Sequence, residues 1–260
     1  MKKYLALLAL LGIAASAYPL RAADEPMSKS DVEGVVKDYL NDHPEVIMDA
    51  LKKFQEKQRA EAATKATATL KSRKEDILTD KNTPIAGNAK GDVTVVEFFD
   101  YHCGYCKKMV PTVTQLLKDD PKLKFSFKEL PILSPDSEVA ARASIAFSRL
   151  APKKYFEYHT ALMGMSGKFD EDSLGAEAKK LGVDPDKLKK EMNSDWVKDE
   201  IKKNHELAEA LNIRGTPGFI IGDTVMPGAA PIEDMKKAIQ TARGGDKDGG
   251  KDDAKKQKGS

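Results

Sequence analysis

Two cysteines, Cys103 and Cys106, carry the chemistry that this sequence of 260 residues offers. They are its only cysteines, so neither thiol has another partner within one molecule. A disulfide that closes so short a loop constrains the unfolded chain little, which makes a structural role a poor explanation. A closed zinc site needs about four ligands, and the scattered histidines do not complete one. We therefore expect reversible thiol-disulfide chemistry without a cofactor or a metal.

The pattern around the cysteines places them at the start of a helix. The apolar run 93–99 predicts a buried strand, and apolar residues at helical spacing follow over 109–117. At such a position the free backbone N–H groups and the helix dipole stabilise a thiolate and lower its pKa. Cys103 is therefore the predicted nucleophile. Cys106, about one turn further in, is the predicted resolving thiol that releases a mixed disulfide.

The elements that follow complete an α/β domain. Alternating apolar residues at 123–127 predict a second strand, so that strand, helix and strand form a βαβ unit. Helical spacings then fill about 137–211, before strand signals return at 218–222 and 224–226. With a last helix over 232–243, the order predicts one domain over residues 83–243 that contains a helical insertion.

This order carries a family resemblance. Glu-Phe-Phe-Asp-Tyr-His-Cys-Gly-Tyr-Cys at 97–106, followed later by Gly-Thr-Pro-Gly at 215–218, resembles the DsbA branch of the thioredoxin superfamily. The resemblance implies a thioredoxin fold in which a cis bond precedes Pro217 and Thr216 presents its backbone to an extended substrate peptide. It also implies that Glu97 is a buried acid that relays the proton of Cys106. Lys128 or Glu129 is the expected partner of Glu97; a solvated Glu97 at a sheet edge is the alternative.

The residues next to the nucleophile bear on the direction of electron flow. With Gly104 and Tyr105 between the cysteines, the motif differs from the Cys-Pro-His-Cys motif typical of the strongest oxidases. Because Tyr105 cannot supply the cation of a histidine, we expect a less stabilised Cys103 thiolate and a less oxidising disulfide. His102 is expected to replace part of that charge.

The amino terminus has the three parts of a secretory signal. Lys2 and Lys3 precede an apolar run over 5–15 and Ala-Ser-Ala at 15–17, which favours a cleaved signal over 1–17 rather than a membrane anchor, with a cut after Ala23 as the alternative. Cleavage after Ala17 leaves equal numbers of basic and acidic residues, which gives no support for a nucleic-acid partner. Export and the resemblance together imply a periplasmic protein.

A helical segment precedes the domain. Apolar residues at helical spacing over 32–40 and 46–54 predict two short helices with a break at 41–44, and a polar, partly helical linker over 56–82. Short helices cannot bury their apolar faces alone, so residues 18–55 are predicted to form a dimer or trimer; docking on the same chain is the alternative. This arrangement is similar to ScsC-like and Com1-like proteins, some of which are oligomeric disulfide isomerases. Residues 244–260 predict a disordered tail.

The favoured function is that of an oligomeric disulfide isomerase or reductase, which acts on unfolded or misoxidised exported proteins and exchanges electrons with a membrane redox partner. A DsbA-like oxidase is the first alternative. A copper-handling protein that uses Cys103 and Cys106 as ligands is the second. Met163 and Met165 are a possible soft copper site but are interpreted as packing residues, and His159 as a helix-surface or packing residue.

Overall fold

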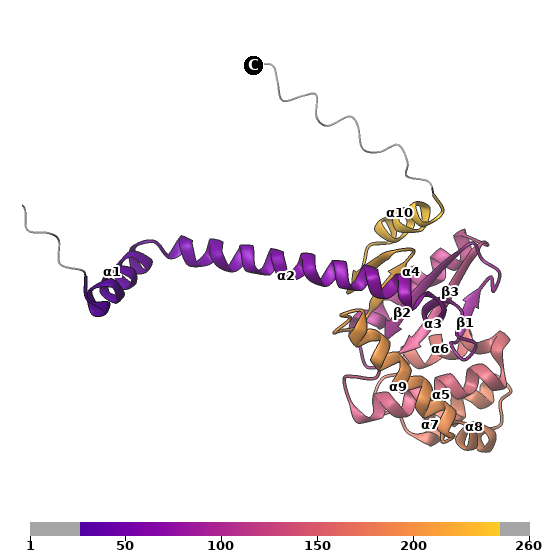
Figure 1. Cartoon of the computed structure of the whole chain (residues 1–260). Helices are drawn as coiled ribbons and strands as arrows, with labels where there is room; N and C mark the ends of the chain where they lie inside the picture. Colours follow the sequence, from indigo (N-terminus) through magenta and orange to yellow (C-terminus); the bar gives the residue numbers. More distant parts are fainter. Residues whose placement is uncertain (1–26, 245–260) are drawn as a thin grey trace, which may run out of the picture. The chain divides into compact units, whose positions relative to one another are not determined.

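The computed structural model describes residues 27–244, and these fall into two units, one ending at Glu56 and one beginning at Lys57 (Figure 1). The predicted signal peptide, with both possible cuts, and the predicted tail beyond Gly244 lie outside the described residues. Helix α2 (Pro44–Ser72) contributes its first part to the first unit and its remainder to the second.

The first unit consists of α1 (Lys29–Asp42) and the beginning of α2. Ser28 and Asp31 form a capping box, in which the Asp31 N–H donates to Ser28 Oγ at 3.2 Å and the Ser28 N–H donates to the Asp31 carboxylate at 3.1 Å. Helix α2 begins at Pro44, where a missing N–H costs nothing. Most large apolar side chains of this first unit are exposed: Val32, Val35, Val36, Tyr39, Val46, Ile47, Met48, Leu51 and Phe54. The unit therefore has no hydrophobic core of its own.

The second unit starts with the remainder of α2, followed by α3 (Lys74–Leu78). The chain is helical from residue 57 to 72, within the range 56–82 that is predicted as a polar, partly helical linker. Ala66 and Leu70 are buried, and Thr69 Oγ1 donates to the carbonyl oxygen of Ala210 at 3.3 Å. These contacts hold this part of α2 on the second unit.

A five-stranded sheet forms the centre of the second unit. The order is β1-β3-β2-β4-β5, built from β1 (Ile85–Gly87), β2 (Val93–Phe99), β3 (Leu123–Glu129), β4 (Gly218–Ile221) and β5 (Thr224–Pro227). Strands β2 and β3 are parallel and are joined through α4 (Gly104–Asp119), as the pattern predicts, while the other pairs are antiparallel. Strand β1 was not predicted, because its three residues carry no recognisable alternation.

Helices make up the insertion and the end of the domain. The insertion contains α5 (Pro135–Leu150), a 3₁₀ turn (Pro152–Lys154), α6 (Tyr155–Gly164), α7 (Glu171–Lys180), α8 (Pro185–Met192) and α9 (Asp195–Ala210). Helix α10 (Ile232–Ala242) follows the β4-β5 hairpin. The predicted thioredoxin fold with a helical insertion is confirmed.

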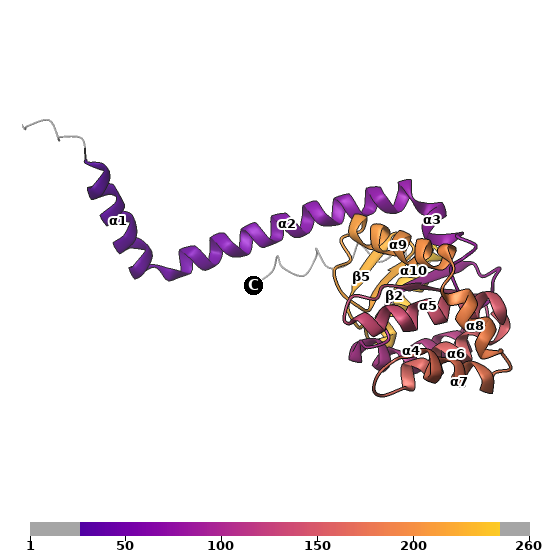
Figure 2. The ribbon, with the colours of Figure 1, turned by 90° about the horizontal axis from the view of Figure 1, so that it is seen from below.

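The alternation of side chains along β2 creates two apolar layers. Val95 and Phe99 belong to the main core with residues of α4, α6 and α10, whereas Val96 and Phe98 belong to a smaller cluster with residues of α3 and the end of α9. Helices α3 and α9 thus lie across the sheet from α4 and α6 (Figure 2). Within residues 27–244, no helix combines the length and apolar character that crossing a membrane requires.

Candidate functional site

Cys103 caps the start of α4, directly after β2 and a short turn. Its Sγ accepts the backbone N–H of Cys106 at 3.4 Å and donates to the carbonyl oxygen of Thr216 at 3.1 Å. Both thiols are free, with Cys103 6% exposed and Cys106 1% exposed. An incoming sulfur atom therefore reaches Cys103 first, and Cys106 lies behind it.

Burial is the main influence on the pKa of the Cys106 thiol. It raises the pKa of Cys106 far above the usual range; a hydrogen bond from the Asp100 backbone opposes this rise, and the charge of Glu97 adds to it. A thiol with so high a pKa keeps its proton until a base removes it. A resolving role for Cys106 thus requires a nearby proton acceptor.

Glu97 lies in β2 on the same sheet face as Val95 and Phe99, 2% exposed, which excludes the solvated edge position. Burial, and secondly the charge of Cys103, raise the pKa of Glu97 to about 8. A carboxyl group with this pKa exchanges its proton near neutral pH. Glu97 therefore has the burial and the pKa of a proton relay.

The two candidate partners of Glu97 lie on opposite faces of the sheet. Lys128 pairs in register with Phe98, and its Nζ donates to Thr83 Oγ1 at 2.9 Å and to Asn204 Oδ1 at 3.3 Å, on the face away from Glu97. The expectation that Lys128 contacts Glu97 is wrong, because side chains alternate along a strand. Glu129 lies on the Glu97 face and is buried.

Burial also raises the pKa of Glu129 well above its usual range. The Ser144 hydroxyl lowers that pKa in part, while the charges of Asp100 and Glu97 raise it further. Two buried carboxyl groups therefore influence each other on one face of the sheet.

The Thr216–Pro217 peptide bond is cis, as the resemblance implies. Pro217 is buried and Thr216 is half-buried. The Pro217 carbonyl oxygen accepts the N–H of Gly228 at 2.8 Å, which holds the loop against the residue that follows β5. This arrangement holds the Thr216 backbone beside Cys103.

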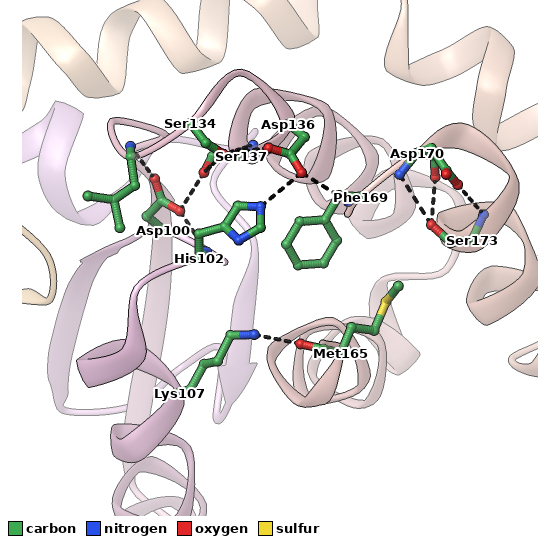
Figure 3. Close-up of polar contacts among 11 residues, drawn as sticks. Asp100, His102, Lys107, Ser134, Asp136, Ser137, Met165, Phe169, Asp170 and Ser173 are labelled. Atoms are coloured by element: carbon green, nitrogen blue, oxygen red, sulfur yellow. Dashed lines mark hydrogen bonds and ion pairs between the residues drawn. The ribbon is translucent and has the colours of Figure 1, made fainter. Parts of the chain in front are cut away.

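Asp100 organises the turn before Cys103, and sequence reasoning missed it. Its buried carboxylate accepts the N–H groups of His102 at 2.8 Å, Ile132 at 2.8 Å and Leu133 at 3.0 Å. It also accepts the Ser137 hydroxyl at 2.8 Å (Figure 3). One charged group thus ties the active-site turn to the loop after β3 and to the start of α5. The only signal for it in the sequence is an acid between an apolar strand and the cysteines.

The His102 side chain points toward the helical insertion. Its Nε2 lies 3.0 Å from Asp136 Oδ2, and its ring meets the Phe169 ring at 4.8 Å between centroids (Figure 3). The Ser134 hydroxyl first, and His102 second, hold the pKa of Asp136 well below its usual range. Asp136 therefore offsets the positive charge that His102 was expected to contribute at Cys103.

The residues between the cysteines are accessible. Gly104 is exposed, and Tyr105 is 63% exposed with Lys108 Nζ 5.4 Å from its ring centroid. Ile132 and Leu133, next to the turn that Asp100 holds, are also exposed. Apolar surface is thus available to a polypeptide near the reactive thiol.

Met163 and Met165, the other candidate ligands, both pack in or against the hydrophobic core. Among residues 27–244, no three His, Cys, Asp or Glu residues are grouped as metal ligands. Met163 is buried in the core, and Met165 offers its carbonyl oxygen to Lys107 Nζ at 2.5 Å (Figure 3). His159 is a buried packing residue whose pKa burial lowers to about 3.

Comparison with known families decides the classification. The model of the DSBA-like thioredoxin domain matches residues 94–240. The chain belongs to the DSBA-like thioredoxin domain family. This DsbA-like chain also matches, over residues 29–61, the model described as copper resistance protein ScsC N-terminal domain.

Individual relatives are similar over most of their length. Disulfide bond formation protein D of Bacillus subtilis is 27% identical over 170 residues, 62% of this DsbA-like chain and 77% of the relative. The crystal structure of BcfH from Salmonella enterica Typhimurium is 29% identical with a TM-score of 0.69, covering 82% of this chain and 95% of BcfH. A periplasmic thioredoxin-like protein from the same serovar is 28% identical with a TM-score of 0.59, covering 65% and 94% of the two chains. The DsbA-like chain is a thiol-disulfide exchange oxidoreductase of the DsbA/ScsC type.

Proposed function

We propose that this oxidoreductase is an oligomeric periplasmic disulfide isomerase or reductase in which Cys103 attacks and Cys106 resolves. The observation that supports it most directly is the position of Cys103 Sγ at the start of α4, 3.1 Å from the Thr216 carbonyl oxygen. A substrate chain that pairs with the Thr216 backbone would bring its own sulfur atoms to this thiol.

The reaction begins when the Cys103 thiolate attacks one sulfur of a substrate disulfide. The substrate S–S bond breaks, a Cys103–substrate disulfide forms, and the second substrate sulfur leaves as a thiolate. In isomerisation, another substrate thiolate attacks the mixed disulfide, forms a new substrate disulfide and restores the Cys103 thiolate. In reduction, Cys106 attacks Cys103 Sγ, so the substrate leaves reduced and the enzyme is left with a Cys103–Cys106 disulfide.

Glu97 is the proposed acceptor of the Cys106 proton. In the mixed disulfide Cys103 carries no charge, which removes one of the two causes that raise the pKa of Glu97. Glu97 then ionises more readily at the stage when Cys106 must lose its proton. In the proposed step the buried Glu97 carboxylate thus receives the proton that the buried Cys106 thiol loses.

The first unit is the proposed oligomerisation segment. Its apolar side chains are exposed along both helices, and residues 29–61 match the ScsC N-terminal domain. Association would bury this apolar surface and bring several Cys103 sites to one misfolded substrate, which raises the effective concentration of thiolate around it. Sedimentation of the full chain tests this: a dimer or trimer is expected, and a monomer would refute it.

The proposed location is the periplasm, as for the thioredoxin-like relative from Salmonella. The predicted signal peptide over residues 1–17 supports this proposal. The proposed substrates are unfolded or misoxidised exported proteins. After each reduction the Cys103–Cys106 disulfide must be reduced again, and we propose a membrane redox partner as the electron donor.

Two forms of ribonuclease separate isomerase from oxidase. We expect the chain, in a glutathione buffer, to recover activity from scrambled ribonuclease faster than the buffer alone. If ribonuclease activity is recovered only from fully reduced ribonuclease and not from the scrambled form, the chain is instead a DsbA-like oxidase.

A copper-handling role is the second candidate, because the family matched by residues 29–61 is described as a copper resistance protein. Cys103 and Cys106 would be its ligands. Cu(I) that stays bound against an excess of a competing thiol would support this role; complete loss to the competitor would exclude it.

A further inference from the structure

A groove runs beside the Thr216–Pro217 loop on the second unit. Its volume is about 430 Å³, and it is lined by three segments: residues 59–66 of α2, the loop 211–217, and residues 225–228 at the outer strand β5. Ala62, Ala63 and Ala66 supply the α2 side. Small methyl groups there leave space that larger side chains would fill.

The α2 side of the groove is held firmly on the second unit. Ala66 and Leu70 are buried, and Leu70 packs with Leu207, Ala208 and Leu211 at the end of α9. Asn212, with φ of 56°, turns the chain from α9 into the loop. The groove therefore lies between elements of one unit.

Charge along the groove is of one sign. Arg59 and Arg214 line it, and its lining contains no acidic residue. Both arginines are exposed, and neither forms an ion pair or a side-chain hydrogen bond with another residue between 27 and 244. Two unpaired guanidinium groups beside an apolar floor favour an apolar ligand that carries a carboxylate.

The groove is continuous with the reactive site. Thr216 and Pro217 belong to its lining, and the Thr216 carbonyl oxygen is the group that lies 3.1 Å from Cys103 Sγ. A polypeptide joined to Cys103 and following this loop would enter the groove within a few residues. Strand addition at β5 is blocked there, since Pro227 has no N–H and the N–H of Gly228 donates to Pro217. The groove therefore fits side chains rather than an added strand.

We propose that this groove binds the substrate polypeptide on one flank of its reacting cysteine, and that it selects a large apolar residue accompanied by an acidic one. The inference rests on the proposed function, because it takes the thiol exchange at Cys103 as given. Substrate choice then comes partly from α2, an element that lies outside the thioredoxin fold.

Two peptide disulfides and one small disulfide test the proposal. The first peptide carries Leu and Asp on both sides of its cysteine, the second carries Ser and Lys instead, and uncharged hydroxyethyl disulfide is too small to occupy the groove. With the Cys106→Ser chain, stopped-flow mixing would give the rate of mixed-disulfide formation for each. We expect the Leu-Asp peptide to react about tenfold faster than the Ser-Lys peptide.

Matched variants test whether the preference for the Leu-Asp peptide arises in the groove. Ala63→Trp fills the groove and should abolish the preference, whereas Ala68→Trp, an exposed position outside the groove lining on the same helix, should leave it intact. Arg59→Glu combined with Arg214→Glu should reverse the preference for acidic peptides. The rate of each variant with hydroxyethyl disulfide normalises its two peptide rates for any change at Cys103 itself.

The outcomes separate the two proposals. If no disulfide reacts, the assignment of Cys103 as nucleophile fails. If all three react but Ala63→Trp keeps the peptide preference, the groove proposal alone is overturned. It is also overturned if Ala63→Trp changes the sedimentation coefficient instead of the peptide rates, because the groove would then receive a second copy of the chain.

Discussion

The Sγ atom of Cys103 lies 3.1 Å from the carbonyl oxygen of Thr216, a residue 113 positions further along the chain. The contact joins the start of α4 to the loop before β4, two segments that meet only because β2 and β4 are neighbours in the sheet. It places the reactive sulfur beside the backbone proposed to hold the substrate.

A substitution at Tyr105 tests whether the charge of this residue sets how oxidising the Cys103–Cys106 disulfide is. The variant Tyr105→His places a cation beside the Cys103 thiolate, which should stabilise the reduced form and make the disulfide more oxidising. We expect the equilibrium constant with glutathione to shift roughly fivefold to tenfold toward the reduced enzyme. Tyr105→Gln, which adds no charge, is the control and should shift it much less. Equal shifts in both variants would show that the charge at this position is unimportant.

Glu97 should make stability depend on pH. Its pKa is about 8 in the folded chain against 4.5 as the ordinary value, so the folded state binds more protons between these limits and loses stability as pH rises through them. Glu97→Gln removes this loss, and urea unfolding should show the variant more stable than the native chain by roughly 3 kcal/mol at pH 7. The difference should vanish near pH 4.5. The exposed control Glu209→Gln should follow the native chain, and parallel curves for Glu97→Gln and the native chain would contradict the account.

Asp100 should be more important for stability than an ordinary acid. In the native chain the two Asp100 carboxylate oxygens accept three N–H groups and a hydroxyl. Asp100→Asn keeps only one acceptor oxygen and turns an amide N–H₂ group toward some of these donors. We expect urea unfolding to show a loss of about 2–4 kcal/mol. Asp199→Asn, on the exposed surface of α9, is the control. A loss no greater than that of the control would mean that the turn is held by other contacts.

Self-association through the first unit should be disrupted by a charged substitution on the apolar face of α1 but not by one on its polar face. Val35 lies on the exposed apolar stripe of α1, so Val35→Glu should dissociate an oligomer that buries this stripe. Lys37→Glu changes the charge on the polar side of the same helix and should leave the assembly intact. Sedimentation of both variants at the same concentration checks this. An oligomer that persists in Val35→Glu would place the interface elsewhere.

Much of the fold follows from local patterns. The apolar run at β2, the alternation at β3 and the helical spacings of the insertion each depend on neighbouring residues, and their bounds agree closely with the structure. Strand β1 escaped prediction because it is defined by its pairing with β3 rather than by its own three residues. Helix α2 extends further than its apolar stripe suggests, because Ala66 and Leu70 find contacts on the second unit.

The site was predictable only where residues form a motif. The cysteine pair and the Thr-Pro sequence are recognisable by spacing and order. Lys128 was misplaced because a strand residue one position away points to the other face. Asp100 and Asp136 carry no spacing signal, and their roles arise from donors on α5 and from the loop that contains Phe169. The groove beside Pro217 needs three segments that are remote in sequence.

Trapping of the mixed disulfide tests the central claim most directly. Cys106→Ser and Cys103→Ser chains, each with one thiol, would be mixed with a disulfide-bonded substrate and analysed by mass spectrometry of their peptides. We expect Cys106→Ser to accumulate a covalent adduct on Cys103 and Cys103→Ser to form almost none, because the remaining thiol is buried and its pKa is raised. An adduct that forms equally fast on Cys106 in the Cys103→Ser chain would contradict the account.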